Sequence, residues 1–337
     1  MILVNLLSAV QIVLESFPVS SSGNVTLLMG FLSKLIGVNQ VPALCQQFLF
    51  FLHGPTVIVL GVFFFKQWRN YCVKLFPFTF TLQRNAKHDA SVYPLVIFGF
   101  ITNAITVFFY ALNNYFEFTS FFPVPLWLGF LITTLLLMST LFIPAFRNSK
   151  LGFHSSSRAQ RGIQVNLMKV KNLLRYLLDF LLLPLDPTAS RCSPLDDEWG
   201  HQPSPCHPEV TKNPSVVTAG VLLGLAQSVA LFVPGISRFA STFVVGRWVG
   251  FAPAQALEYS FLIEMPLITA GFLKGFWWII KTPEGHTMIN GSFLITLIIS
   301  TVLAYLGLML VARLVERNKI WLFGFYTGLL AVISFAL

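Results

Sequence analysis

Long apolar runs separated by short polar loops are the feature that most limits the fold of this 337-residue chain. Hydrophobic residues make up 55% of the sequence and charged residues only 10%, a composition outside the range of soluble globular domains. Several runs reach the length of about 20 residues that a helix needs to cross a bilayer. The sequence therefore predicts an all-α, polytopic integral membrane protein.

The formal net charge of +9 would suggest a nucleic-acid partner in a soluble protein. Here the lysines and arginines lie in loops between apolar runs, where they determine the orientation of membrane spans. We therefore expect the bilayer, and no nucleic acid, as a partner.

The apolar runs form two similar units. The first unit, residues 1–146, has a short re-entrant hairpin at 1–38 and spans at about 44–65, 92–112 and 125–146. The second unit, residues 215–337, has a hairpin at 215–252 and spans at about 254–280 (interrupted at Pro266), 292–312 and 319–336. Between them, residues 147–214 are rich in Arg, Lys and Pro and are predicted to be a polar cytoplasmic insert.

The two hairpins share one sequence frame. Gln11, Pro18 and Ser21 in the first correspond to Gln227, Pro234 and Ser237 in the second, all at an offset of 216 residues. Because each unit has an odd number of full spans, the second unit is expected to lie upside down relative to the first, as in inverted-topology repeats. The basic loops at 66–90, 147–214 and 313–319 then fall on one side, which is predicted to be cytoplasmic.

The hairpins differ in charge. Glu15 in the first corresponds to Leu231 in the second, and Arg238 in the second corresponds to Ser22 in the first. An arginine at membrane depth costs roughly 2.5–3.5 kcal/mol on insertion scales, so we expect it to face a cavity and an anionic partner. Half-helices that begin after these turns would also point backbone N–H groups into the cavity, and this combination is typical of phosphate binding.

Several roles remain open from the residues alone. A carboxylate beside a phosphate can act as an acid or base, or can hold a metal ion. Ser21 or Ser237 is available as a nucleophile, although neither has a histidine nearby in the sequence. The structural alternative is a Glu15–Arg238 ion pair at a helix kink, with no chemistry.

Three further ionisable residues lie in apolar runs. His53 is interpreted as a packing residue. Of Glu258 and Glu264, which are 6 residues apart and point to different faces of one helix, we expect one near the cavity and one nearer an interface.

The hairpin motifs resemble the two signature motifs of the bacitracin-resistance type undecaprenyl-diphosphate phosphatases. The first motif is Gln11-x-x-x-Glu15 with Ser-Phe-Pro-Val-Ser-Ser-Ser-Gly at 16–23, and the second is Pro-Gly-Ile-Ser-Arg at 234–238 with Thr242. Residues 256–262 with Pro266, and residues 323–326, resemble two further stretches of that family. The resemblance implies a multi-pass enzyme of the bacterial inner membrane that hydrolyses undecaprenyl diphosphate to undecaprenyl phosphate and inorganic phosphate. It would recycle the carrier lipid for peptidoglycan synthesis, confer bacitracin resistance and use a divalent cation, Mg²⁺ or Ca²⁺.

The resemblance and the repeat together select the site residues. Catalytic roles are expected for Glu15, Ser21 and Arg238, and a cation is expected at Glu15 with Gln11. Substrate binding is expected at Gln11, Ser22, Asn24, Gln227, Gly235, Ser237 and Thr242. Asn24 stands where most family members have histidine, and Phe239 replaces a small residue. Attack by serine or by water stays open, as does a homodimer, and the alternative function is a polyprenyl-phosphate flippase built on the same repeat.

Overall fold

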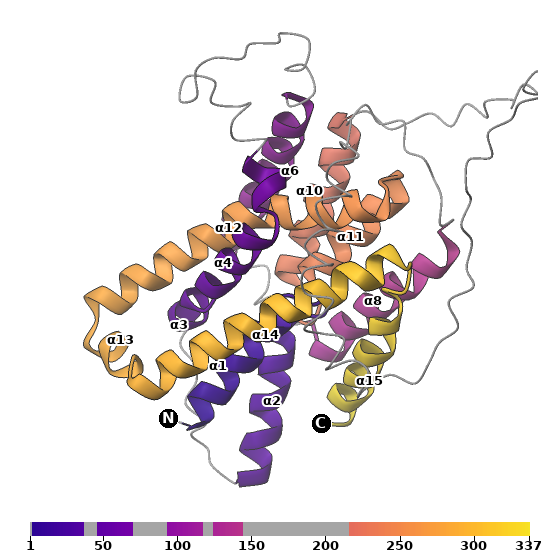
Figure 1. Cartoon of the computed structure of the whole chain (residues 1–337). Coiled ribbons are helices and arrows are strands. Elements are labelled where there is room, and N and C mark those ends of the chain that lie inside the picture. The colour runs from indigo at the N-terminus through magenta and orange to yellow at the C-terminus, as the bar shows by residue number, and fades with distance from the viewer. Residues whose placement is uncertain (1, 37–45, 70–92, 117–123, 144–215) are drawn as a thin grey trace, which may run out of the picture. The chain divides into compact units, whose positions relative to one another are not determined.

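The computed structural model describes residues 2–36, 46–69, 93–116, 124–143 and 216–337, which belong to one compact unit (Figure 1). All regular elements within these ranges are helices, which confirms the predicted all-α class. The first half contains α1 (Ile2–Leu14), α2 (Ser21–Ile36), α3 (Gln46–Phe51), α4 (His53–Phe63), α6 (Tyr93–Phe116), α8 (Leu126–Ser139) and the short η2 (Thr140–Phe142). The second half contains α10 (Val216–Phe232), α11 (Arg238–Val249), α12 (Pro253–Lys281), α13 (Pro283–Met288), α14 (Gly291–Glu316) and α15 (Leu322–Ala336). The predicted insert and the basic loop at 66–90 lie almost wholly outside the described residues.

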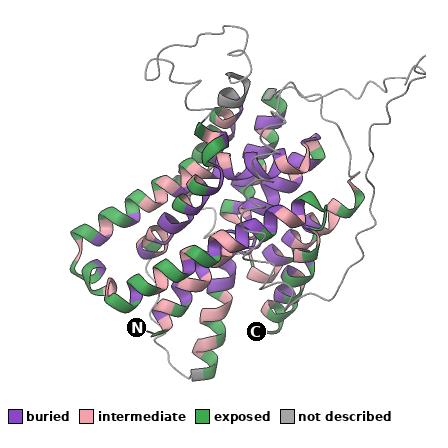
Figure 2. Cartoon of the chain, in the orientation of Figure 1, coloured by how far each residue is buried: buried purple, intermediate pink, exposed green. Residues whose placement is uncertain are grey.

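The outer faces of these helices are apolar. Among the described residues, three segments are long and apolar enough to cross a bilayer, namely Gln46–Phe63, α12 and α14, and five shorter apolar helices accompany them. On α14 the exposed residues include Ile295, Ile298 and Val302, whose spacing of three and four residues places them on one side of the helix. Exposed positions recur along this helix in Figure 2. Continuous apolar surface of this kind is unfavourable in water and favourable in lipid. The chain is therefore a membrane protein.

Two predicted spans differ from the helices that form. The predicted span at 44–65 is divided into α3 and α4, with a break at Leu52. The predicted interruption at Pro266 is wrong, because α12 runs through this proline without a break. A proline removes one backbone donor, and tight packing against neighbouring helices allows a helix in an apolar environment to continue past that loss.

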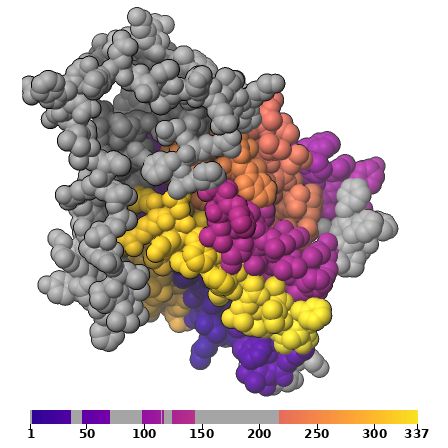
Figure 3. Space-filling model, turned by 90° about the vertical axis from the view of Figure 1, so that its right-hand side faces the viewer, coloured from indigo at the N-terminus to yellow at the C-terminus, as the bar shows by residue number. Residues whose placement is uncertain are grey.

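Each hairpin packs against a helix from the other half of the chain. Helix α1 packs against α14, and α10 packs against α6. Further contacts between the halves join α8 to α15 and α12 to both α3 and α4. In Figure 3 the magenta surface of α8 lies directly against the yellow surface of the C-terminal helices. The two halves are therefore interleaved, and neither hairpin is held by its own half alone.

Helix α8 holds the turn of the second hairpin. The backbone N–H of Ser237 donates to Thr133 Oγ1 at 3.1 Å, and the Thr133 hydroxyl lies 3.2 Å from the carbonyl oxygen of Gly235. Gly235 has a φ of 89°, which favours glycine. At Gly129 an added Cβ would overlap the carbonyl of Pro234, so the turn lies directly on the helix backbone. These contacts fix the backbone immediately before Arg238.

Candidate active site

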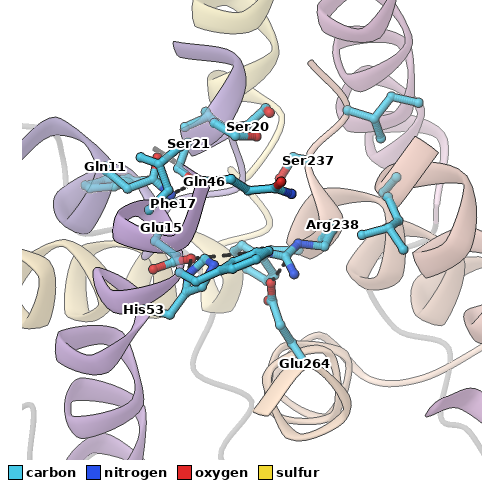
Figure 4. A pocket seen from close by; sticks show the side chains of 18 residues that line it. Gln11, Glu15, Phe17, Ser20, Ser21, Gln46, His53, Ser237, Arg238 and Glu264 are labelled. Carbon is cyan, nitrogen blue, oxygen red and sulfur yellow. Dashed lines mark hydrogen bonds and ion pairs between the residues drawn. The ribbon is translucent and has the colours of Figure 1, made fainter. Parts of the chain in front are cut away.

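A cavity of about 260 Å³ lies between the two hairpins (Figure 4). Three groups of elements surround it: the first hairpin, the end of α10 with the start of α11, and α3, α4 and α12. Its lining consists of Gln11, Glu15, Phe17, Val19, Ser20, Ser21, Ser22, Gln46, Leu49, Phe50, His53, Ala230, Leu231, Ile236, Ser237, Arg238, Phe239 and Glu264. The prediction that Arg238 faces a cavity is therefore confirmed.

Glu15 is buried and its carboxylate has partners on both oxygens. His53 Nδ1 forms an ion pair with Oε1, and the Thr56 hydroxyl donates to Oε2 at 2.5 Å. Arg238 Nη2 lies 4.0 Å from Oε1. A buried carboxylate is tolerated when it is paired and hydrogen-bonded, and these three groups meet that condition. They also fix its orientation toward the cavity.

Arg238 is the first residue of α11 and reaches between two carboxylates. Its Nε lies 3.3 Å from Glu264 Oε1, and the Glu15 carboxylate lies on the other side (Figure 4). The arginine side chain keeps 25% of its surface exposed, whereas that of Glu264 keeps 10%. The anionic partner expected for the arginine is thus present twice. Of the two α12 carboxylates, Glu264 lines the cavity, while Glu258 is buried and does not.

The serines at the two turns are not equivalent. Ser237 Oγ accepts from the N–H of Ala240 at 3.2 Å and so caps α11. In the first hairpin the matching bond, from the N–H of Gly23 at 3.2 Å, goes to Ser20 Oγ. Ser21 is left out of capping, and its hydroxyl accepts from Gln11 Nε2 at 3.2 Å. Of these three serines, Ser21 is therefore the one whose oxygen carries no capping bond.

Not all predicted site residues lie on this cavity. Gly235 lines an adjoining cavity of about 390 Å³ that also contains Ser22. Asn24 is buried, donates to the carbonyl of Ser20 at 2.7 Å and accepts from the Tyr326 hydroxyl at 2.6 Å. Thr242 donates to the carbonyl of Arg238 at 2.9 Å. Gln227 is buried, with no hydrogen-bond partner for its side-chain amide among the described residues.

Sequence reasoning missed two groups that approach the charged centre. His53 was interpreted as a packing residue, yet it pairs with Glu15. Thr56, one helical turn further along α4, completes the set around that carboxylate. The available signal was a histidine and a threonine three residues apart in an otherwise apolar run, since residues at that spacing share one helix face.

The residues present fit a hard divalent cation as a partial ligand set. Gln11 Oε1 is buried without a hydrogen-bond partner, and the Glu15 carboxylate borders the same cavity. Within the described residues no group of three His, Cys, Asp or Glu side chains is placed to hold a metal. Mg²⁺ commonly needs only one or two protein oxygens when phosphate oxygens and water complete its shell. The donor set therefore suits a cation that arrives with a phosphate.

Comparison with known proteins links the second half of the chain to one family. Residues 199–333 match the family model described as bacitracin resistance protein BacA. The chain is 36% identical over 115 residues to undecaprenyl-diphosphatase 2 of Mesorhizobium japonicum, which covers 34% of this chain and 42% of the relative. It is 30% identical over 121 residues to undecaprenyl-diphosphatase of Korarchaeum cryptofilum, which covers 36% and 44%.

The chain thus spans less than half the length of these relatives. The family match includes Arg238, Ser237 and Glu264, whereas Glu15 and Ser21 lie outside it. The family match at 199–333 therefore agrees with the second hairpin motif, at 234–238, and does not cover the first. The resemblance predicted from the hairpin motifs is confirmed for residues 199–333, which are similar to the family of bacitracin resistance protein BacA.

Proposed function

We propose that this protein is a phosphatase of the bacterial inner membrane that hydrolyses undecaprenyl diphosphate to undecaprenyl phosphate and inorganic phosphate. In this role it recycles the carrier lipid for peptidoglycan synthesis and confers bacitracin resistance. The observation that carries the proposal is the meeting of Glu15 and Arg238, 223 positions apart in the sequence, over one cavity with serines from both hairpins. The two relatives described above are both undecaprenyl-diphosphatases, which supports the same reaction.

We further propose that the fold is an inverted repeat, with each unit a hairpin followed by three spans. Support comes from the packing. If α1 exchanges with α10 and α14 with α6, the α1–α14 contact becomes the α10–α6 contact. The same exchange pairs α8 with α15, and α3 and α4 with α12. The α8–α15 contact and the contact of α3 and α4 with α12 are therefore each mapped onto themselves. Interleaved halves with broken helices at their centre are typical of inverted repeats.

The cavity suits a head group better than a whole lipid. Its volume of about 260 Å³ is below the roughly 300–1,000 Å³ of pockets that enclose a drug-sized molecule. The adjoining cavity shares Ser22, Ala230, Leu231 and Ile236 with it and is lined largely by residues 230–236, the apolar end of α10 and the turn after it. The diphosphate would therefore lie between the hairpins, while the isoprenoid tail leaves along this second cavity toward the lipid.

Arg238 would bind the terminal phosphate, together with backbone N–H groups at the starts of α2 and α11. The positive ends of these helix dipoles point toward negative charge. Placement and charge neutralisation supply most of the acceleration in phosphoryl transfer, because the transition state spreads negative charge over the phosphoryl oxygens. The buried pairing of Glu15 keeps the opposing carboxylate fixed and limits its repulsion of the substrate.

Attack on the terminal phosphorus breaks its bond to the bridging oxygen, and undecaprenyl phosphate leaves. In the serine route Ser21 Oγ attacks, and water then hydrolyses the phosphoserine to release phosphate. In the water route a water molecule attacks directly. The absence of a capping bond on Ser21 supports the serine route, because its oxygen accepts one hydrogen bond, from Gln11, and keeps a second lone pair for attack.

A divalent cation, Mg²⁺ or Ca²⁺, is proposed at Gln11 and Glu15. When bound, it would neutralise diphosphate charge and orient the leaving group. Gln11 and Glu15 would contribute oxygen ligands, and the amide of Gln11 would keep its donor for Ser21.

The test is phosphate release from undecaprenyl diphosphate by the full chain purified in detergent, with Mg²⁺, with Ca²⁺ and with chelator. We expect release that depends on the cation and is reduced at least about 100-fold in Arg238→Ala, since removal of one charge-stabilising donor typically costs that much. Arg317→Ala is the matched control, because Arg317 is exposed at the end of α14 and does not line the cavity. Equal release by Arg238→Ala and wild type would refute the assignment.

The alternative function is a polyprenyl-phosphate flippase. The observation that favours it is the pair of broken helical hairpins, which secondary transporters also use. Transfer of the lipid across vesicles without phosphate release would support the flippase, whereas phosphate release would exclude translocation as the sole activity.

A further inference from the structure

Glu264 is a buried carboxylate for which the proposed reaction has no use. It lies within α12, one of the helices long enough to cross the membrane, and its side chain keeps only 10% of its surface exposed. Burying a carboxylate in an apolar span is costly unless a partner compensates it. Among the described residues its ion-pair partner is Arg238, at 3.3 Å from Nε. Glu264 therefore has a direct means of acting through that arginine.

The contact with Glu264 leaves a defined part of the guanidinium free. This planar group has five N–H donors in a rigid fork, on Nε, Nη1 and Nη2. In Arg238 the Nε faces Glu264 and Nη2 approaches Glu15, so carboxylates line one edge of the group. Nη1 has no protein partner among the described residues, and Arg238 lines the cavity. The edge formed by Nη1 and Nη2 is thus available for two parallel hydrogen bonds to a phosphate.

The position of Arg238 also makes an external support necessary. As the first residue of α11, its backbone is fixed by the capping bonds of Ser237 and Thr133, but its side chain has several rotatable bonds. A flexible side chain loses rotamer freedom on binding a ligand, which weakens binding unless it is already ordered. Glu264 reaches it from another helix and supplies that order.

We infer that Glu264 is a positioning residue, which holds Arg238 with its Nη1–Nη2 edge directed at the terminal phosphate of an isoprenyl diphosphate. The inference rests on the proposed function and adds to it the residue that sets the direction of the phosphate-binding group. In this role Glu264 does not touch the substrate.

The experiment measures binding, so that it does not depend on turnover. The probe is the non-hydrolysable methylene-bridged analogue of farnesyl diphosphate, titrated into the full chain in detergent. Glu264→Ala is expected to weaken the Kd about tenfold, within the range for coupled charged groups in contact. Glu264→Gln is expected to stay within about threefold of wild type, because its amide oxygen still accepts from Nε–H.

The decisive comparison is made without the arginine. In an Arg238→Ala background, Glu264→Ala is expected to cause no further loss, because the two residues act as one unit. The matched control is Glu258→Gln, which removes a buried carboxylate from the same helix away from the cavity and should leave the Kd unchanged. Thermal unfolding in detergent confirms that each variant is folded.

Two outcomes overturn the inference: binding by Glu264→Ala that is as tight as or tighter than in wild type, or an equal loss in the Arg238→Ala background. The second would identify a structural role. Failure of the proposed function gives a different result, because then wild-type protein neither binds the analogue nor releases phosphate.

Discussion

The two hairpins are built on one frame and perform different tasks. Both have a proline three residues before a serine and a helix that begins beside the cavity. In the first, Glu15 is surrounded by His53 and Thr56 from α4. In the second, the matching position is Leu231, and the charge is Arg238 at the start of the second helix. A duplicated frame can thus keep its backbone geometry while each copy carries one sign of charge.

The hairpins also differ in what holds their turns. The second turn rests on Gly129 and Thr133 of α8 and passes through Gly235 at positive φ. In the first, the position matching Gly235 is Val19, whose φ is not positive. The arginine-bearing turn therefore depends on the other half of the chain for its shape.

The largest expected effect comes from removing the charge asymmetry. Glu15→Ala leaves His53 and Arg238 without the carboxylate that lies near both, so we expect phosphate release to fall at least about 100-fold. Leu231→Ala, at the matching position of the second hairpin, is expected to retain release within about threefold. The measurement is phosphate release by the two purified variants. Equal losses would show that the carboxylate of the first hairpin contributes no more to activity than the matching apolar residue of the second.

Disrupting the contact between α8 and the second turn should cause a large loss of stability. Gly129→Ala forces a Cβ into the carbonyl of Pro234, and overpacking of this kind costs roughly 1–3 kcal/mol. Gly30→Ala in α2 meets no atom within 4 Å and is expected to be neutral or stabilising. The measurement is the thermal midpoint in detergent, with phosphate release as a second readout. A Gly129→Ala protein as stable as Gly30→Ala would contradict the described contact.

The serines provide a test of equivalence between the turns. Ser20→Ala and Ser237→Ala each remove a helix cap and should cost about 1 kcal/mol of stability. Ser21→Ala removes no cap, so its thermal midpoint should stay near that of wild type. If Ser21→Ala destabilises the protein as much as Ser237→Ala, the turns are equivalent and the assignment of capping is wrong.

The smallest effect is expected at Asn24. Tyr326→Phe removes the hydrogen bond to its side-chain oxygen, which costs about 1 kcal/mol of stability. Because Asn24 does not line the cavity, phosphate release should stay within about twofold of wild type. A loss greater than tenfold without a change in thermal midpoint would instead support the predicted binding role of Asn24.

The sequence was sufficient to predict the all-helical class and the placement of Arg238 beside a cavity. Apolar runs show where helices form, and an arginine between them requires a cavity and an anion. The pairing of His53 with Glu15 was not predictable, because it depends on how α4 packs against the first hairpin. Gln227 and Thr242 were selected by the frame of the repeat or by resemblance, but in a helix only some faces reach the cavity. The interruption predicted at Pro266 does not occur, because a single missing backbone donor does not end a well-packed helix.

The contact between α1 and α14 has a consequence for how the protein is made. The ribosome produces roughly 5–20 residues per second, so α14 emerges about 15–60 s after α1. For roughly 11–45 s of that interval Glu15 has been synthesised and Arg238 has not, because 223 residues separate them. His53 and Thr56 follow Glu15 by about 40 residues and are the first groups able to compensate its charge. We therefore expect α4 to pair with Glu15 and stabilise the nascent first hairpin in the membrane until the second half of the chain is synthesised.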